Sequence, residues 1–382
     1  MSSDRNSTRL SRISSMRFDP YISRCRPCRP TWHAQTARIR HSTSAAPWAT
    51  ATAACALDFD KRPRWGGATI SPSRTRKRQS TRLPPIASAR ASIARVHRIP
   101  LTDSLPSDLI DMPFVTIDGQ PLHYQIRGSG APVLFGHSYL WDSSMWEPQL
   151  EALSKSYRVI APDLWGHGQS GPLPDGTNDL DDLAMQMCAL LDHLGIDTCS
   201  IVGLSVGGMW AVPLAHRAPQ RIDRLVLMDT YVGVEPDATR NKYFQMLAAI
   251  DAQGAIPAPL LDAIVPIFFR PGIDLASELP AGFRRALQAF TAERLRDSVI
   301  PLGKITFGRE DARAKLSALP AERTLVMCGA NDVARPPEEA DEIAALIGCE
   351  KVFVPKAGHI SNLENPAFVT QALIDWLARG GD

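Results

Sequence analysis

The chain has 382 residues, of which 44% are hydrophobic and 21% charged, a balance typical of globular proteins. This length allows one large domain or two ordinary ones. No apolar run approaches the roughly 18 residues of a spanning helix, and no secretory signal pattern opens the chain, so we expect a cytoplasmic protein without a membrane segment.

Residues 1–111 differ in composition from the rest of the chain. The first 100 residues contain 18 Arg and 2 Lys against 4 Asp and no Glu, and the remainder is acidic. Such a segment buries too little apolar surface to offset its ordering entropy. It is either a dispensable extension from a mis-set start, an organelle targeting segment or a nucleic-acid-binding arm. We favour the first, because a strand pattern follows Met112 at once.

The seven cysteines lack the spacing of a disulfide scaffold. Cys25 and Cys28 form a single C-x-x-C without a second pair or nearby histidine ligands, so a zinc site is not expected there. Cys199 and Cys328 lie in apolar runs and are expected to be buried.

From Met112 onward, short apolar runs alternate with helical patterns. Asp118-Gly119 separates the first two runs and predicts a hairpin. Leu180–Leu194 has the apolar spacing of an amphipathic helix, and Gly195 follows as a stop. The expected strands contain Phe114–Ile117, Leu122–Ile126, Val133–Phe135, Arg158–Ala161, Ser200–Val202, Leu225–Met228, Thr324–Met327 and Lys351–Val354. This alternation predicts a mostly parallel, doubly wound α/β sheet over residues 112–382.

One long segment interrupts the alternation. Residues from about 232 to 320 contain no clear strand, and several prolines divide helix-forming stretches there. A structureless loop of that length is unusual in a compact domain. We therefore expect a helical cap that lies over the sheet and sets substrate selectivity.

The strongest motif is Gly203-Leu204-Ser205-Val206-Gly207, a G-x-S-x-G sequence. It follows a predicted strand and opens a predicted helix, which is the setting that the nucleophile elbow requires. Glycines allow the strand and helix to approach, and the helix N-terminus offers free N–H groups to an oxyanion. Ser205 is the predicted nucleophile.

A serine hydroxyl needs a base, which follows it in this chain order. Only two histidines follow Ser205, and His216 lies too far along the same helix to reach it. His359, after the last strand, is the predicted base. The acid is expected at a strand end between them: Asp332 is our prediction, and Asp229, after the preceding strand, is the alternative.

At these residues the chain resembles the α/β-hydrolase superfamily, over about residues 113–380. The motifs that carry the resemblance are Gly136-His137, the stretch from Asp163 to Ser170, the elbow at Ser205, Asp332 and Gly358-His359. The chain departs from the usual pattern at Ser138, where the family usually has Gly, and at Trp165, where it usually has Arg. The esterase, enol-lactonase and cofactor-free perhydrolase branch is the most similar.

The resemblance implies a Ser205–His359–Asp332 triad and an oxyanion hole formed by the N–H groups of Tyr139 and Val206. It implies a serine hydrolase that cleaves a small carboxylic ester or lactone through an acyl-enzyme, without metal or organic cofactor and without nucleic acid as a partner of this domain. The alternatives are a carbon–carbon bond hydrolase, a perhydrolase and a non-catalytic binding protein. Aromatic residues near the motif loops and in the cap predict an apolar substrate pocket: Trp141, Trp165, Trp210, Phe268 and Phe269.

Overall fold

The computed structural model describes residues 113–380. The predictions made for residues 1–111, including Cys25 and Cys28, lie outside this range. Among the described residues, no helix combines the length and apolar character needed to cross a membrane.

An eight-stranded sheet forms the centre of the described domain, in the order β1-β2-β4-β3-β5-β6-β7-β8. Strands β1 and β2 pair antiparallel with each other, β2 pairs antiparallel with β4, and all other pairs are parallel. The strands are β1 (Phe114–Ile117), β2 (Gln120–Arg127), β3 (Ala131–Gly136), β4 (Tyr157–Pro162), β5 (Cys199–Leu204), β6 (Ile222–Met228), β7 (Thr324–Gly329) and β8 (Glu350–Val354).

Local sequence explains these strands. Asp118 and Gly119 turn the β1–β2 hairpin with φ values of 50° and 82°, which is the backbone that a two-residue hairpin turn requires. Every residue of β5 and β7 is buried, because helices cover both faces of the parallel part of the sheet. The predicted fold class is confirmed.

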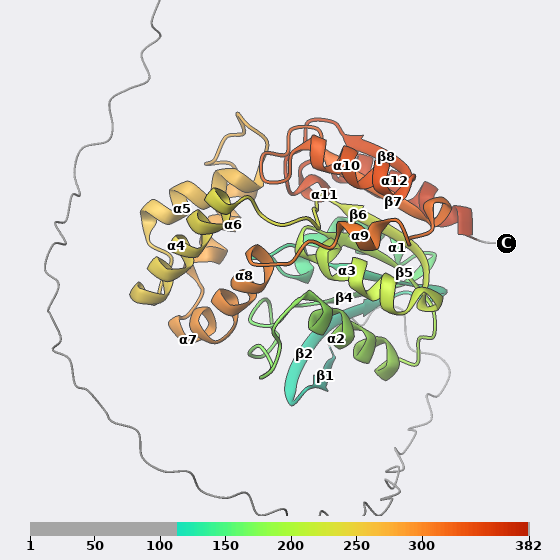
Figure 1. Ribbon diagram of the computed structural model, residues 1–382, viewed down its shortest axis with the longest axis horizontal. Coiled ribbons are helices and arrows are strands. Elements are labelled where there is room, and N and C mark those ends of the chain that lie inside the picture. Colours follow the sequence, from blue (N-terminus) through green and yellow to red (C-terminus); the bar gives the residue numbers. More distant parts are fainter. Residues whose placement is uncertain (1–112, 381–382) are drawn as a thin grey trace, which may run out of the picture. The chain divides into compact units, whose positions relative to one another are not determined.

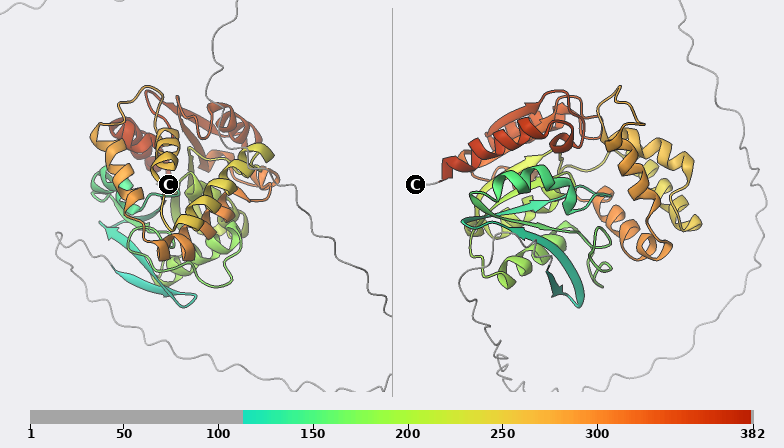
Figure 2. Two further views of the ribbon diagram at one scale, coloured as in Figure 1. Left: turned by 90° about the vertical axis from the view of Figure 1, so that its left-hand side faces the viewer. Right: turned by 180° about the vertical axis from the view of Figure 1, so that it is seen from behind.

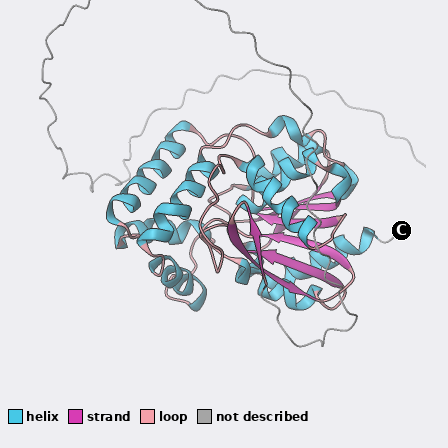
Figure 3. Cartoon of the chain, turned by 90° about the horizontal axis from the view of Figure 1, so that it is seen from below, coloured by secondary structure: helices cyan, strands magenta, loops and turns pink. Residues whose placement is uncertain are grey.

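Helices lie on both faces of the sheet (Figure 3). In one layer, α2 packs against α3, α3 against α9, and α9 against α10. In the other layer, α1 packs against α12. These helices are α1 (Glu147–Leu153), α2 (Leu180–His193), α3 (Val206–Arg217), α9 (Arg313–Leu316), α10 (Pro337–Ile347), α11 (Ser361–Glu364) and α12 (Pro366–Leu377).

The segment between β6 and β7 is a helical insertion. Its first five α-helices, here called the cap helices, form a separate group drawn in yellow and orange (Figure 1), and the views from other sides agree (Figure 2). They are α4 (Asp237–Gln253), α5 (Ala258–Ile264), α6 (Glu278–Gln288), α7 (Ala292–Arg294) and α8 (Ile300–Phe307). A π-helical turn, Leu295–Val299, joins α7 to α8.

The fold brings the loops after β3, β5, β6, β7 and β8 to one edge of the sheet, because parallel strands have their carboxyl ends on the same side. Side chains that follow these strands in sequence therefore meet, although they are up to about 220 residues apart.

Candidate active site

Ser205 stands on a sharp turn between β5 and α3. Its φ of 55° and ψ of −117° are strained for a residue with a Cβ, and its N–H donates to Met228 O at 2.9 Å. The turn is possible because Gly207 lies against β3, where a Cβ would overlap the carbonyl group of Gly136. The strained backbone lifts the Ser205 hydroxyl above the end of the sheet.

The structure brings the three predicted triad side chains into one hydrogen-bonded chain. His359 Nε2 lies 3.0 Å from Ser205 Oγ, and His359 Nδ1 lies 2.9 Å from Asp332 Oδ2. All three residues are buried. The second oxygen of Asp332, Oδ1, accepts the N–H groups of Ala334 and Arg335 at 2.8 and 2.9 Å, which fixes the carboxylate in place.

The loops that carry Asp332 and His359 are joined through their backbones. Asn331 N–H donates to Ala357 O at 2.9 Å, and Ala330 N–H donates to Val354 O at 2.9 Å. Gly329 allows this approach, because a Cβ there would overlap the Gly358 carbonyl oxygen. Backbone contacts between the two loops thus add to the side-chain hydrogen bond between Asp332 and His359.

Tyr139, in the loop after β3, lines the same cavity as Ser205. The Tyr139 hydroxyl donates to Val299 O at 2.7 Å, which ties this loop to the π-helical turn of the insertion. Val206 is the first residue of α3. Since the first N–H groups of a helix have no partner within it, the Val206 N–H is available to an oxyanion.

Two buried histidines support the same loop. His167 Nε2 accepts the Leu140 N–H at 3.1 Å, and His137 Nε2 accepts the Leu164 N–H at 2.7 Å. Burial lowers the pKa of His167 to about 3 and also lowers the pKa of His137. Both rings are therefore neutral at physiological pH, as a ring nitrogen that accepts an N–H must be. Both rings therefore hold these loops by accepting backbone N–H groups.

A cavity of about 90 Å³ lies above Ser205 and His359. Its walls are mostly apolar and come from the cap helices, the π-helical turn and the loop after β3. The residues that line it include Tyr139, Leu140, Met209, Tyr243, Met246, Leu247, Ile250, Ile264, Phe268, Leu295, Val299, Ile300 and Phe307.

Of the five aromatic residues predicted for the substrate pocket, Phe268 lines this cavity and four do not. Trp165 and Trp210 are fully buried, and Trp165 Nε1 donates to Gln186 Oε1 at 2.7 Å. Trp141 stacks on Phe283 with ring centroids 4.4 Å apart, and Phe269 is buried beside them. These four side chains pack the core and the base of the insertion instead.

One wall of the cavity is charged. Glu235 and Arg335 line it, and Glu235 Oε1 accepts from Arg335 Nη2 at 2.7 Å and from Arg309 Nη1 at 2.9 Å. Glu235 and Arg309 flank the cap helices, whereas Arg335 follows Asp332 closely. Sequence reasoning missed this cluster, since nothing in the local pattern at these positions indicates that they meet.

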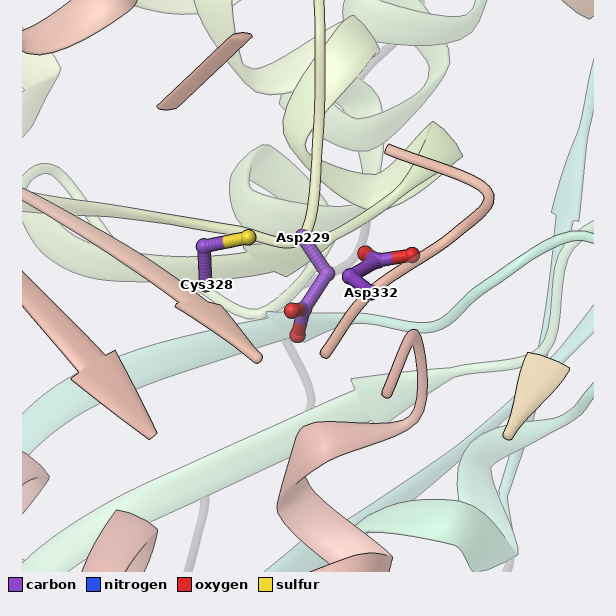
Figure 4. Close-up of side chains that lie close together, drawn as sticks. All are labelled: Asp229, Cys328 and Asp332. Carbon is purple, nitrogen blue, oxygen red and sulfur yellow. The ribbon is translucent and has the colours of Figure 1, made fainter. Parts of the chain in front are cut away.

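The alternative acid, Asp229, lies at the end of β6, and its side-chain hydrogen bonds go to Gly329 and Ser361. Its Oδ1 accepts the Gly329 N–H at 2.6 Å, and the Ser361 hydroxyl is 2.5 Å from its Oδ2. Ligand atoms of Asp229, Cys328 and Asp332 lie within 4.8 Å of one another, and Figure 4 shows Asp229 between the other two. Hydrogen bonds already occupy both carboxylates, so we assign no metal site to this group.

A family model described as the alpha/beta hydrolase fold matches residues 131–366. The chain belongs to this family. A candidate carbamate hydrolase named RutD, from Variovorax paradoxus, is 30% identical over 275 residues, covering 68% of this chain and 97% of that protein. The 3-oxoadipate enol-lactonase 1 of Acinetobacter baylyi is 28% identical and covers 65% of this chain and 90% of its own length.

Solved structures also resemble this hydrolase. The enol-lactonase from Burkholderia xenovorans LB400 superposes with a TM-score of 0.61 at 28% identity, covering 70% of this chain and 100% of that chain. A thermophilic esterase from Thermogutta terrifontis gives 0.61 at 27% identity, covering 71% and 98%. The family predicted from the motifs is confirmed.

Proposed function

We propose that this hydrolase cleaves a carboxylic ester or lactone through an acyl-enzyme formed on Ser205. The observation that carries the proposal is the hydrogen-bonded chain from Ser205 through His359 to Asp332 at the floor of an apolar cavity. The sequence relatives whose names describe hydrolysis of carbonyl compounds support the same reaction type.

Each residue of the site has a role in the proposed reaction. His359 Nε2 takes the proton of Ser205 Oγ as that oxygen attacks the substrate carbonyl carbon. Asp332 keeps the other ring proton on Nδ1 and stabilises the imidazolium. The N–H groups of Val206 and Tyr139 stabilise the oxyanion. The imidazolium then protonates the leaving oxygen, and a water molecule, activated by His359, releases the acyl group from Ser205.

A panel of esters and related carbonyl compounds tests this function. We expect turnover of short p-nitrophenyl esters or simple lactones by the full chain, because the apolar cavity of about 90 Å³ suits a short acyl group. A carbamate and a vinylogous 1,5-diketone, measured in parallel, represent amide-type and carbon–carbon cleavage. Turnover of the diketone alone would contradict the proposal.

Phe268 is expected to control the choice between acyl groups. Its ring lines the cavity and contacts the His359 ring edge-on at 5.6 Å. Phe268→Ala should raise the ratio of kcat/KM for an octanoyl ester to that for an acetyl ester about tenfold, since methylene groups in an apolar pocket contribute on this scale. Because a disturbance of His359 would slow the hydrolysis of both esters alike, it cancels in this ratio.

Phe269→Ala is the matched control for this prediction. Phe269 is buried beside Phe283 and does not line the cavity. Its truncation should lower stability by about 3–5 kcal/mol and leave the octanoyl-to-acetyl ratio unchanged. Equal shifts of the ratio in both variants would show that Phe268 has no particular role in selectivity.

A further inference from the structure

Two adjacent residues at the end of β6 contact the loops of all three triad members. Thr230 Oγ1 donates to the carbonyl oxygen of Ser205 at 2.7 Å. Asp229 accepts the Gly329 N–H at the start of the Asp332 loop and bonds Ser361, two residues after His359. Asp229 has a φ of 45°, a strained value for this residue. Such strain persists only where surrounding contacts fix it.

The surroundings of Asp229 disfavour ionisation of its carboxyl group. Asp229 is 1% exposed, and its carboxyl group lies within 4.8 Å of that of Asp332. Two carboxylates so close together in a buried site do not both ionise readily. The Cys328 thiol belongs to the same cluster, and the carboxyl group of Glu364 further disfavours a negative charge on Asp229. His359, the basic side chain of the triad, pairs with Asp332.

Hydrogen bonding decides which of the two carboxyl groups keeps the negative charge. Asp332 receives two backbone N–H groups and His359 Nδ1–H. Asp229 receives one backbone N–H, and its other partner, Ser361 Oγ, is a hydroxyl that can also accept. Burial first, and the charge of Asp332 second, raise the pKa of Asp229 well above its ordinary value.

We propose that Asp229 is a positioning residue that acts as a neutral carboxylic acid, holding the Asp332 and His359 loops against the end of β6 without placing a second charge beside Asp332. In this form Oδ1 accepts the Gly329 N–H, and the acid proton lies in the 2.5 Å bond between Oδ2 and Ser361 Oγ. The inference rests on the proposed triad, because it concerns the loops that carry Asp332 and His359.

Two variants, Asp229→Asn and Asp229→Ala, test whether Asp229 acts as a neutral acid or as a carboxylate anion. An asparagine reproduces the neutral group: its carbonyl oxygen can accept the Gly329 N–H, and its amide can donate to Ser361 Oγ. We expect kcat/KM of the Asn variant within about threefold of wild type and kcat of the Ala variant lowered about tenfold or more. KM should change little in either, because Asp229 does not line the cavity.

The pH dependence of stability gives a second readout that needs no turnover. A neutral Asp229 releases its proton on unfolding above the ordinary carboxyl pKa, so its contribution to stability is full at low pH and falls as pH rises towards the raised native pKa. The Asn variant has no such loss. The Tm of Asp229→Asn minus that of wild type should therefore increase from pH 5 to pH 8.

Two results would overturn the inference. One is a Tm difference that stays constant or falls with pH, as an ionised, hydrogen-bonded Asp229 requires. The other is an Asn variant as inactive as the Ala variant. Asp332→Asn, measured beside them, tests the triad separately: its full activity would contradict the proposed function, while the Tm comparison would still report the charge of Asp229.

Discussion

Ser205→Ala is expected to abolish ester hydrolysis while leaving the fold intact. Ser205 Oγ is the hydroxyl that His359 Nε2 contacts, at 3.0 Å, and it is at the elbow between β5 and α3. Because the members of a triad act as a unit, removing the nucleophile should lower kcat by about 10⁶-fold. Any residual rate would come from the oxyanion hole and binding.

Ser138→Ala provides the matched control for the nucleophile. Ser138 is also a buried serine of the same cavity, and its hydroxyl has no hydrogen-bond partner within the described part of the chain. Its removal should leave kcat/KM within a few fold of wild type. The check is a steady-state ester assay with thermal melts of both variants, since Ala can adopt the Ser205 backbone as well as Ser does. Comparable losses in the two variants would exclude Ser205 as nucleophile.

The sheet was predictable because its signals are local. Each strand is a short apolar run followed by turn residues, and burial on both faces makes such runs continuous. The elbow was equally predictable, because strand, G-x-S-x-G and helix must follow one another within a few residues. The order Ser205, Asp332, His359 then limited the choice to a few strand ends.

The lining of the cavity at Ser205 was not predictable from the same signals. Trp165 and Trp210 lie next to motif residues in the sequence, but proximity along the chain does not decide whether a side chain faces the core or the cavity. The motif loops also carry no information about α4, whose Tyr243, Leu247 and Ile250 line the cavity. Their i, i+4, i+7 spacing indicates one helix face, but not what that face contacts.

Choosing between Asp332 and Asp229 required distances. Both carboxylates follow strands that end at the same edge of the sheet, and both are buried. What distinguishes them is that Asp332 lies 2.9 Å from His359 Nδ1, whereas Asp229 forms hydrogen bonds with Gly329 at the end of β7 and with Ser361 after β8. The two aspartates follow neighbouring strands, β6 and β7, but only Asp332 forms a hydrogen bond with the histidine. The order of residues in the sequence does not reveal which of the two does so.

Asp332→Asn should lower kcat by about 10³–10⁴-fold, because it imposes the wrong tautomer on His359. The direction follows from the contacts of Asp332. Its Oδ1 accepts two backbone N–H groups, so an asparagine must place its carbonyl oxygen there. The amide nitrogen then occupies the Oδ2 position, 2.9 Å from His359 Nδ1, and donates to it. The ring proton moves to Nε2, which can no longer accept the proton of Ser205. The test compares the steady-state kcat of Asp332→Asn with that of Asp229→Asn at the same pH. A larger loss of kcat in Asp229→Asn would assign the acid to Asp229.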